Sequence, residues 1–188
     1  ALNPYEAYDG KVIKSIRFVQ VDILDGSVED TLKYSTSGFS KFLNRTHVHT
    51  HEWVLKQYML VKAGDSIIPA ILADNERVIR EIDYIEDASF WIVPDPFNDN
   101  EVELIVVTKD IFPVGATASF SSFKNYSASL WDGNIGGFGY ELGGKLIYNA
   151  DFNNPWGYNL HTNYNNFWGS FINGSINWYD AFGAQWLK

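Results

Sequence analysis

Three histidines at alternate positions, in the run His47-Val-His-Thr-His51, are the residues most suited to metal chemistry. On an extended segment, alternate side chains lie on one face, so His47, His49 and His51 would together offer three imidazole ligands to zinc or copper. Thr50, however, is a good N-cap for a helix predicted over residues 50–60, and that helix would turn His51 away. We therefore expect a polar turn here and no metal, with the three-histidine site as the alternative.

A second candidate is a cluster of six carboxylates around a helix predicted over residues 69–81. They are Asp74, Glu76, Glu81, Asp83, Glu86 and Asp87. Paired carboxylates serve general acid–base catalysis, but no nucleophile or defined pocket accompanies these. The chain also has no Cys, no G-x-S-x-G motif and no Gly-rich phosphate loop opening a helix. We expect a solvated helix face, no enzymatic activity and no cofactor.

The elements that position these residues fall into two parts of different composition. Residues 1–113 hold 11 of the 14 Lys+Arg and 19 of the 23 Asp+Glu, whereas residues 114–188 hold 18 of the 31 aromatic residues and 11 of the 15 glycines. The formal net charge of −9 argues against a nucleic-acid partner. No apolar run approaches the ~18 residues that a transmembrane helix needs.

The first part predicts a small α+β domain. Hydrophobic alternation predicts a strand over residues 11–22, and apolar stripes predict the two helices already named. Two further strands, over residues 88–93 and 101–108, flank a turn rich in Pro, Asn and Asp. The order is β-α-α-β-β, in which two helices cover one face of a three-stranded sheet.

The second part predicts consecutive strands with one apolar and one polar face. They cover residues 115–123, 126–131, 140–149, 156–167 and 170–180. Apolar-out, polar-in strands of about ten residues with aromatic ends are typical of transmembrane β-barrels. Tryptophan, tyrosine and asparagine are also abundant on carbohydrate-binding faces, so a soluble carbohydrate-binding β module is an alternative.

The first part resembles a known family. Gly64-Asp65, residues 72–77 (LADNER), residues 82–88 (IDYIEDA) and Val107-Thr-Lys-Asp110 are similar to the polypeptide-transport-associated (POTRA) domain of the outer-membrane barrel-assembly and protein-translocation superfamily, closest to its Bacteroidetes-type members. Residues 24–45 depart from the short family pattern and are interpreted as an insertion. The likeness continues through about residue 183, where residues 132–139 and 166–169 resemble the first two periplasmic turns of the barrel.

The resemblance implies an α+β POTRA domain over residues 8–112 in the periplasm. It is followed over residues 113–188 by the first antiparallel strands of a transmembrane β-barrel in the bacterial outer membrane. Because five strands cannot close a barrel, we expect the barrel to be incomplete in this chain. The implied partners are unfolded or extended outer-membrane and secreted proteins, the lipid bilayer and accessory lipoproteins. A barrel that anchors or transports a single secreted partner, or a fused hydrolase, is the alternative.

The same resemblance suggests two sites for clients. The first is the edge strand of the POTRA sheet, which would pair with an extended client by β-augmentation; its residues are Ala88, Ser89, Phe90, Trp91, Ile92 and Val93. The second is the first barrel strand, whose small side chains would leave the barrel seam weakly held; its residues are Ala116, Thr117, Ala118, Ser119, Phe120 and Ser121.

Overall fold

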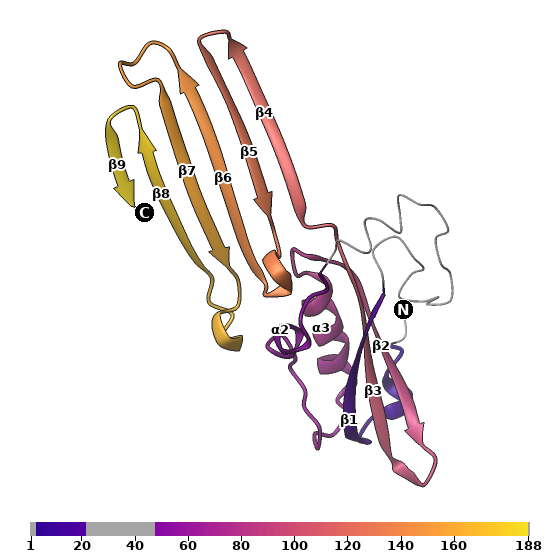
Figure 1. The fold of residues 1–188 in the computed structure, drawn as a ribbon. Helices are drawn as coiled ribbons and strands as arrows, with labels where there is room; N and C mark the ends of the chain where they lie inside the picture. The colour runs from indigo at the N-terminus through magenta and orange to yellow at the C-terminus, as the bar shows by residue number, and fades with distance from the viewer. Residues whose placement is uncertain (1–2, 22–47, 188) are drawn as a thin grey trace, which may run out of the picture. The chain divides into compact units, whose positions relative to one another are not determined.

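The computed structural model describes residues 3–21 and 48–187 (Figure 1). It divides into two compact units, Ala1–Phe112 and Pro113–Lys188, which are called unit 1 and unit 2 below. The insertion predicted over residues 24–45 and the first histidine, His47, lie outside the described residues. Of the helices that the structure describes, none is long and apolar enough to cross a membrane.

Unit 1 contains a three-stranded sheet of β1 (Val12–Val21), β2 (Ile85–Asp95) and β3 (Asn98–Asp110). The order is β1-β3-β2, with β3 parallel to β1 and antiparallel to β2. The turn between β2 and β3 is narrower than predicted, so both strands are longer. The Asp95 carboxylate accepts the Phe97 N–H at 2.8 Å, which closes the turn within two residues.

A short 3₁₀ helix, η1 (Glu6–Tyr8), precedes β1. Two α-helices, α2 (Glu52–Lys56) and α3 (Pro69–Arg80), follow β1 along the chain. The predicted N-cap of the first helix is wrong. Thr50 is buried, and its N–H and hydroxyl both donate to the Asp110 carboxylate, at 2.7 and 3.0 Å, so His51 takes the N-cap position. The helix is also shorter than predicted, because buried Asn75 binds the backbone beyond it. Its side chain accepts the Leu60 N–H at 2.7 Å and donates to the Tyr58 carbonyl at 2.9 Å.

The core of unit 1 lies between the helices and one face of the sheet (Figure 1). Val102, Leu104 and Val106 of β3 alternate along the strand and all point to this face, where they are fully buried. Leu72 and Ile79 of α3 pack there at a spacing of seven residues, which places them on one side of the helix. The core therefore fixes α3 against the sheet.

Unit 2 is a six-stranded antiparallel sheet in which each strand pairs with its neighbour in the sequence. The strands are β4 (Val114–Ser122), β5 (Asn125–Asp132), β6 (Tyr140–Asn149), β7 (Trp156–Tyr164), β8 (Gly174–Ala181) and β9 (Ala184–Leu187). Strand β6 spans the predicted residues, whereas β7 and β8 are shorter and β9 was not predicted. The sheet is open among the described residues, with β4 and β9 at its two edges.

Two turns at the same end of this sheet use buried asparagines, Asn134 between β5 and β6 and Asn166 between β7 and β8. Each side-chain oxygen accepts a backbone N–H five residues further along, from Gly139 and Phe171 respectively, both at 2.7 Å. In the second turn Asn166 itself is left-handed, with φ of 58°. These bonds draw residues 165–173 into a compact turn, with the 3₁₀ helix η3 (Phe167–Gly169) inside it. The turn explains why β7 ends earlier, and β8 begins later, than predicted.

Candidate functional site: an apolar sheet face and two strand edges

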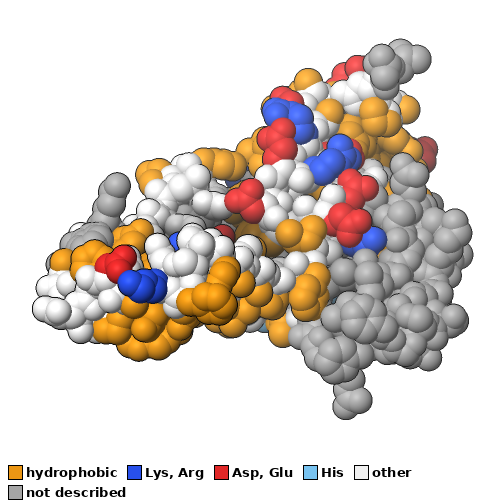
Figure 2. Space-filling view, turned by 90° about the horizontal axis from the view of Figure 1, so that it is seen from above, with side chains coloured by type: hydrophobic (Ala, Val, Ile, Leu, Met, Phe, Trp, Pro, Cys, Tyr) orange, Lys and Arg blue, Asp and Glu red, His pale blue; other side chains and the backbone are white. Residues whose placement is uncertain are grey.

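The strand register in unit 2 assembles apolar side chains on one face of the sheet. Ala116, Leu130, Gly144, Leu160 and Trp178 form one continuous row across five strands. The neighbouring rows add Leu142, Leu146 and Ile176, and all the leucines on this face are exposed. Figure 2 shows hydrophobic side chains gathered along one side of this sheet, with few charged groups among them. A monomeric soluble protein rarely leaves such an extended apolar surface uncovered.

Aromatic rings bound this face at both strand ends. At one end Tyr126 stacks on Tyr148 with centroids 4.8 Å apart, and Trp156 lies edge-on to Tyr148 at 4.9 Å. At the other end Tyr140 stacks on Tyr164 at 4.3 Å. Tyr140 and Tyr148 are eight residues apart on β6, which corresponds to about 27 Å along a strand. On a strand tilted by about 35–45°, this length covers about 20 Å along the membrane normal, which is most of the ~25 Å apolar band between the two aromatic girdles of outer-membrane barrels.

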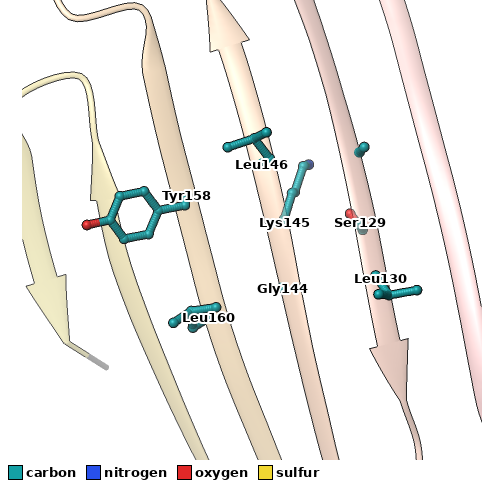
Figure 3. A pocket seen from close by; sticks show the side chains of 8 residues that line it. Ser129, Leu130, Gly144, Lys145, Leu146, Tyr158 and Leu160 are labelled. Atoms are coloured by element: carbon teal, nitrogen blue, oxygen red, sulfur yellow. The ribbon is translucent and has the colours of Figure 1, made fainter.

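The apolar face contains a shallow depression rather than an enclosed pocket. It measures about 350 Å³ and lies around Gly144, where the missing side chain lowers the surface between Leu130, Leu146 and Leu160 (Figure 3). Tyr158 and Ala128 complete its apolar rim. Such an open, apolar surface lacks the convergent polar groups of a site for a polar substrate.

The opposite face of the same sheet is polar. The Glu141 carboxylate accepts a hydrogen bond from Asn163 at 2.7 Å and lies 3.1 Å from His161 Nε2. Gly143 is directly opposite His161 in the register and leaves room for its ring, because an added Cβ would overlap that ring. The asparagines Asn159, Asn163 and Asn177 lie on this face, away from the tyrosine stacks. Trp131 and Tyr179 also lie on this face, and Tyr179 is directly opposite Asn159 in the register. Rings and amides therefore occur together here, and the carbohydrate-binding alternative stays a prediction.

The predicted seam residues all lie in β4, at one edge of the sheet. Every residue from Ala116 to Ser122 is exposed, and β4 pairs only with β5 among the described strands. Five of its eight ladder partners are small or polar, such as Ala128 opposite Ala118 and Ser127 opposite Ser119. The register shifts after Phe120, so Ser121 has no partner in the ladder. Strand β4 therefore has one bare edge and weak cross-strand side-chain packing.

The predicted client edge, Ala88 to Val93, lies in β2, and its outer side meets no other strand among the described residues. Part of this edge is nevertheless occupied. The Ala88 carbonyl accepts from Arg80 Nη2 at 2.6 Å, and the Phe90 N–H donates to Glu76 Oε2 at 2.9 Å. The Phe90 carbonyl accepts from the Tyr5 hydroxyl at 3.4 Å.

The acidic cluster is thus only partly the solvated face that the sequence predicted. Asp74 and Glu81 are exposed and pair with Arg77, as expected for a surface helix. Glu76 is different, because its carboxylate holds the β2 backbone, and Asp87 caps the Ala88 N–H at 2.8 Å. Sequence reasoning missed these roles. The only signal was an i,i+4 pair of Glu76 and Arg80 on α3, which many exposed helices share.

The histidines give no metal site among the described residues. No group of three His, Cys, Asp or Glu with metal-binding geometry occurs in residues 3–21 and 48–187. His49 Nδ1 lies 3.9 Å from the buried Asp110 carboxylate, and His51 caps α2 by position. The described part of the run, residues 48–51, therefore leads into α2, and His49 contacts Asp110 of β3.

Comparison with known proteins finds a solved structure with a similar fold. No protein-family model matches the sequence, and no curated protein sequence matches it. The solved structure of BamA from Haemophilus ducreyi lacking POTRA domains 1–3 is similar, with a TM-score of 0.60 and 16% sequence identity. The match covers 90% of this chain and 28% of that BamA chain. The likeness shows the fold. This chain spans little more than a quarter of the BamA chain that it matches.

Proposed function

We propose that the chain is the membrane-proximal part of a Bacteroidetes-type outer-membrane protein assembly or translocation component. Residues 8–112 would form a periplasmic POTRA-type domain and residues 113–188 the first strands of the barrel. The observation that carries this proposal is the apolar face of unit 2, bounded by tyrosine stacks about 27 Å apart along a strand. The BamA-like fold supports the same assignment.

The function follows from two strand edges on one chain. Strand β2 offers its outer edge to an extended client, and β4 offers a bare edge for the client's next pairing. Strand β3 ends at Asp110 and β4 begins at Val114, so three residues connect the two strands. The sheet that would capture the client is thus joined by a short link to the strand that would pair with it next. The clients would be extended outer-membrane or secreted proteins. The lipid bilayer and accessory lipoproteins would be further partners.

Cysteine crosslinking tests this function directly, because the chain has no cysteine of its own. Single cysteines at Thr117 and Ser119 of β4, in the full-length protein, should form disulfides with cysteines in the terminal strand of a nascent barrel protein during its assembly into vesicles. A cysteine at Ser127 of β5, which lies opposite Ser119 inside the sheet, is the matched control. Uniform absence of crosslinks at Thr117 and Ser119 would overturn templating and favour an anchor for one partner or for a fused hydrolase.

A further inference from the structure

The side chains along the outer edge of β2 form one connected network. Arg80 donates to Glu76 Oε1 at 2.6 Å and to Asp87 Oδ1 at 2.9 Å, and Tyr5 donates its hydroxyl to the other oxygen of Glu76. Each of these four residues also hydrogen-bonds to the backbone of Ala88 or Phe90. We call Tyr5, Glu76, Arg80 and Asp87 the latch.

The inner part of the latch is built into the fold, whereas its Arg80–Asp87 ion pair lies at the surface, with 45% and 44% of the two side chains exposed. Tyr5 is 4% exposed and belongs to the core cluster, so its ring is fixed beside β2. Burial and the bond to Glu76 raise the Tyr5 pKa well above its ordinary value, so the hydroxyl stays a donor. Bonds from charged groups to backbone N–H and C=O are about twice as strong as neutral ones.

The latch covers only the first half of the β2 edge. Backbone groups that face outward recur every second residue, so Ile92 follows Ala88 and Phe90 on this side. Ile92 has no latch partner among the described residues, and its neighbours Trp91 and Val93 are exposed on the face away from the helices. Pro94 has no N–H to offer. The edge open to a strand is therefore centred on Ile92.

We infer that a side-chain latch gates β2, so that an extended apolar–polar client strand docks first at Ile92 and pairs with Phe90 and Ala88 only by displacing Glu76 and Arg80. This inference rests on the proposed capture of clients at β2. When a client strand replaces the latch, hydrogen bonds to the client replace hydrogen bonds to Glu76 and Arg80. The net gain in binding free energy is small, because the backbone groups of Ala88 and Phe90 already have partners. The latch thus keeps capture weak and reversible, which suits a strand that must be passed on.

The test uses a peptide that copies residues 140–149, an alternating strand, with one added cysteine. In the full chain, single cysteines replace Ser89 beside the latched half or Val93 beside the open half. Cross-strand neighbours approach within disulfide range. Disulfide yield is compared in four chains: the unaltered latch, Arg80→Ala, Glu76→Ala and Arg77→Ala. Arg77 is the matched control, because it also lies on α3 but forms ion pairs only with Asp74 and Glu81 among the described residues.

With the latch intact, we expect the yield at Val93 to exceed that at Ser89 by about tenfold, since two or three backbone bonds are blocked. Arg80→Ala and Glu76→Ala should raise the Ser89 yield about tenfold, while Arg77→Ala leaves it unchanged. Equal yields at Ser89 and Val93 in the intact chain would overturn the latch but not the capture. No disulfide at either position in any variant would overturn capture at β2 itself.

Amide hydrogen exchange keeps the test decisive if a variant folds poorly. In a folded latch variant, exchange at the Phe90 amide should accelerate at least tenfold, because its acceptor Glu76 is lost, while the amide of Leu104 in the central strand stays protected. Unchanged exchange at Phe90 in Glu76→Ala would overturn the latch.

Discussion

Units 1 and 2 place their apolar residues in opposite ways. In unit 1 the leucine and valines of β3 face helices, and Leu104 is completely buried. In unit 2 no second layer covers the described sheet, and Leu130 and Leu160 remain 61% and 48% exposed. The first unit buries its apolar residues internally, whereas the second leaves them at its surface, as the proposed bilayer location would require. The same alternation of residues thus gives a core in one unit and a membrane-type surface in the other.

The strand edges differ in a parallel way. The β2 edge, in the charged unit, is held by carboxylate, guanidinium and hydroxyl groups. The β4 edge, in the unit with few charges, is bare among the described residues and carries small side chains. An exposed edge in water invites aggregation and is usually guarded. Side chains thus guard the edge in the charged unit, whereas the unit with few charges has no such guard among the described residues.

The largest expected effect is loss of the core of unit 1. Leu104→Ala should destabilise that unit by about 2–5 kcal/mol, because it leaves a cavity at a fully buried position. Leu130→Ala, at an exposed position, leaves no cavity and should cost less than about 1 kcal/mol. Urea titration in phospholipid vesicles, with amide exchange resolved by unit, measures both. Similar losses would break the contrast between a core and a surface.

A charge on the apolar face of unit 2 should have the next largest effect. Leu160→Arg lies midway between the two aromatic rows and should cost about 2–4 kcal/mol in a bilayer. Thr117→Arg places the same charge on the polar face and should be nearly neutral. Insertion into vesicles and resistance to unfolding there are the measurements. Equal behaviour of the two variants would contradict a lipid-facing side.

A buried amide in unit 1 tests how its helices are held. Asn75→Ala should cost about 1–3 kcal/mol, because it strips the buried Tyr58 carbonyl and the partly buried Leu60 N–H of their partner. The adjacent change Asp74→Ala removes only an exposed pair with Arg77 and should cost less than about 1 kcal/mol. Thermal unfolding compares them. If Asp74→Ala costs as much, the amide is not what fixes the connection between α2 and α3.

The smallest effect concerns close packing on the polar face of unit 2. Gly143→Ala should cost about 1–2 kcal/mol, because the added Cβ meets the His161 ring and lies 3.0 Å from Trp131 Cβ. Gly174→Ala meets nothing within 4 Å and should be nearly neutral. Stability in detergent micelles distinguishes them. A neutral Gly143→Ala would show that the His161 and Trp131 rings can move aside freely.

The sequence predicted the strand-by-strand organisation well where periodicity was strong. Residues 140–149 alternate without interruption, and β6 has those bounds. It failed where a side chain replaces backbone bonding. Thr50 looked like an N-cap but binds Asp110, and Asn166 shortens β7 and β8 by folding the turn around itself. These hydrogen bonds join residues at irregular distances along the chain, so no periodic pattern in the sequence predicts them.

The candidate sites show the same division. Sequence reasoning identified the strands that carry Ala88 to Val93 and Ala116 to Ser121, and the family resemblance singled them out as sites. Period-two alternation separated the apolar from the polar face of unit 2. Local sequence, however, does not state which strand lies at an edge. The order β1-β3-β2 and the contacts of Tyr5, Glu76 and Arg80 with β2 were decided by tertiary packing, since their partners lie up to 85 residues away.

The sequence by itself therefore determined where apolar and polar side chains fall along each strand, because side-chain direction follows from backbone geometry. Tertiary structure alone decided that residues 88–90 are latched while Ile92 and the β4 edge stay open among the described residues. The physical reason is that a backbone group's availability depends on every group brought near it by folding. Chain order does not encode that proximity.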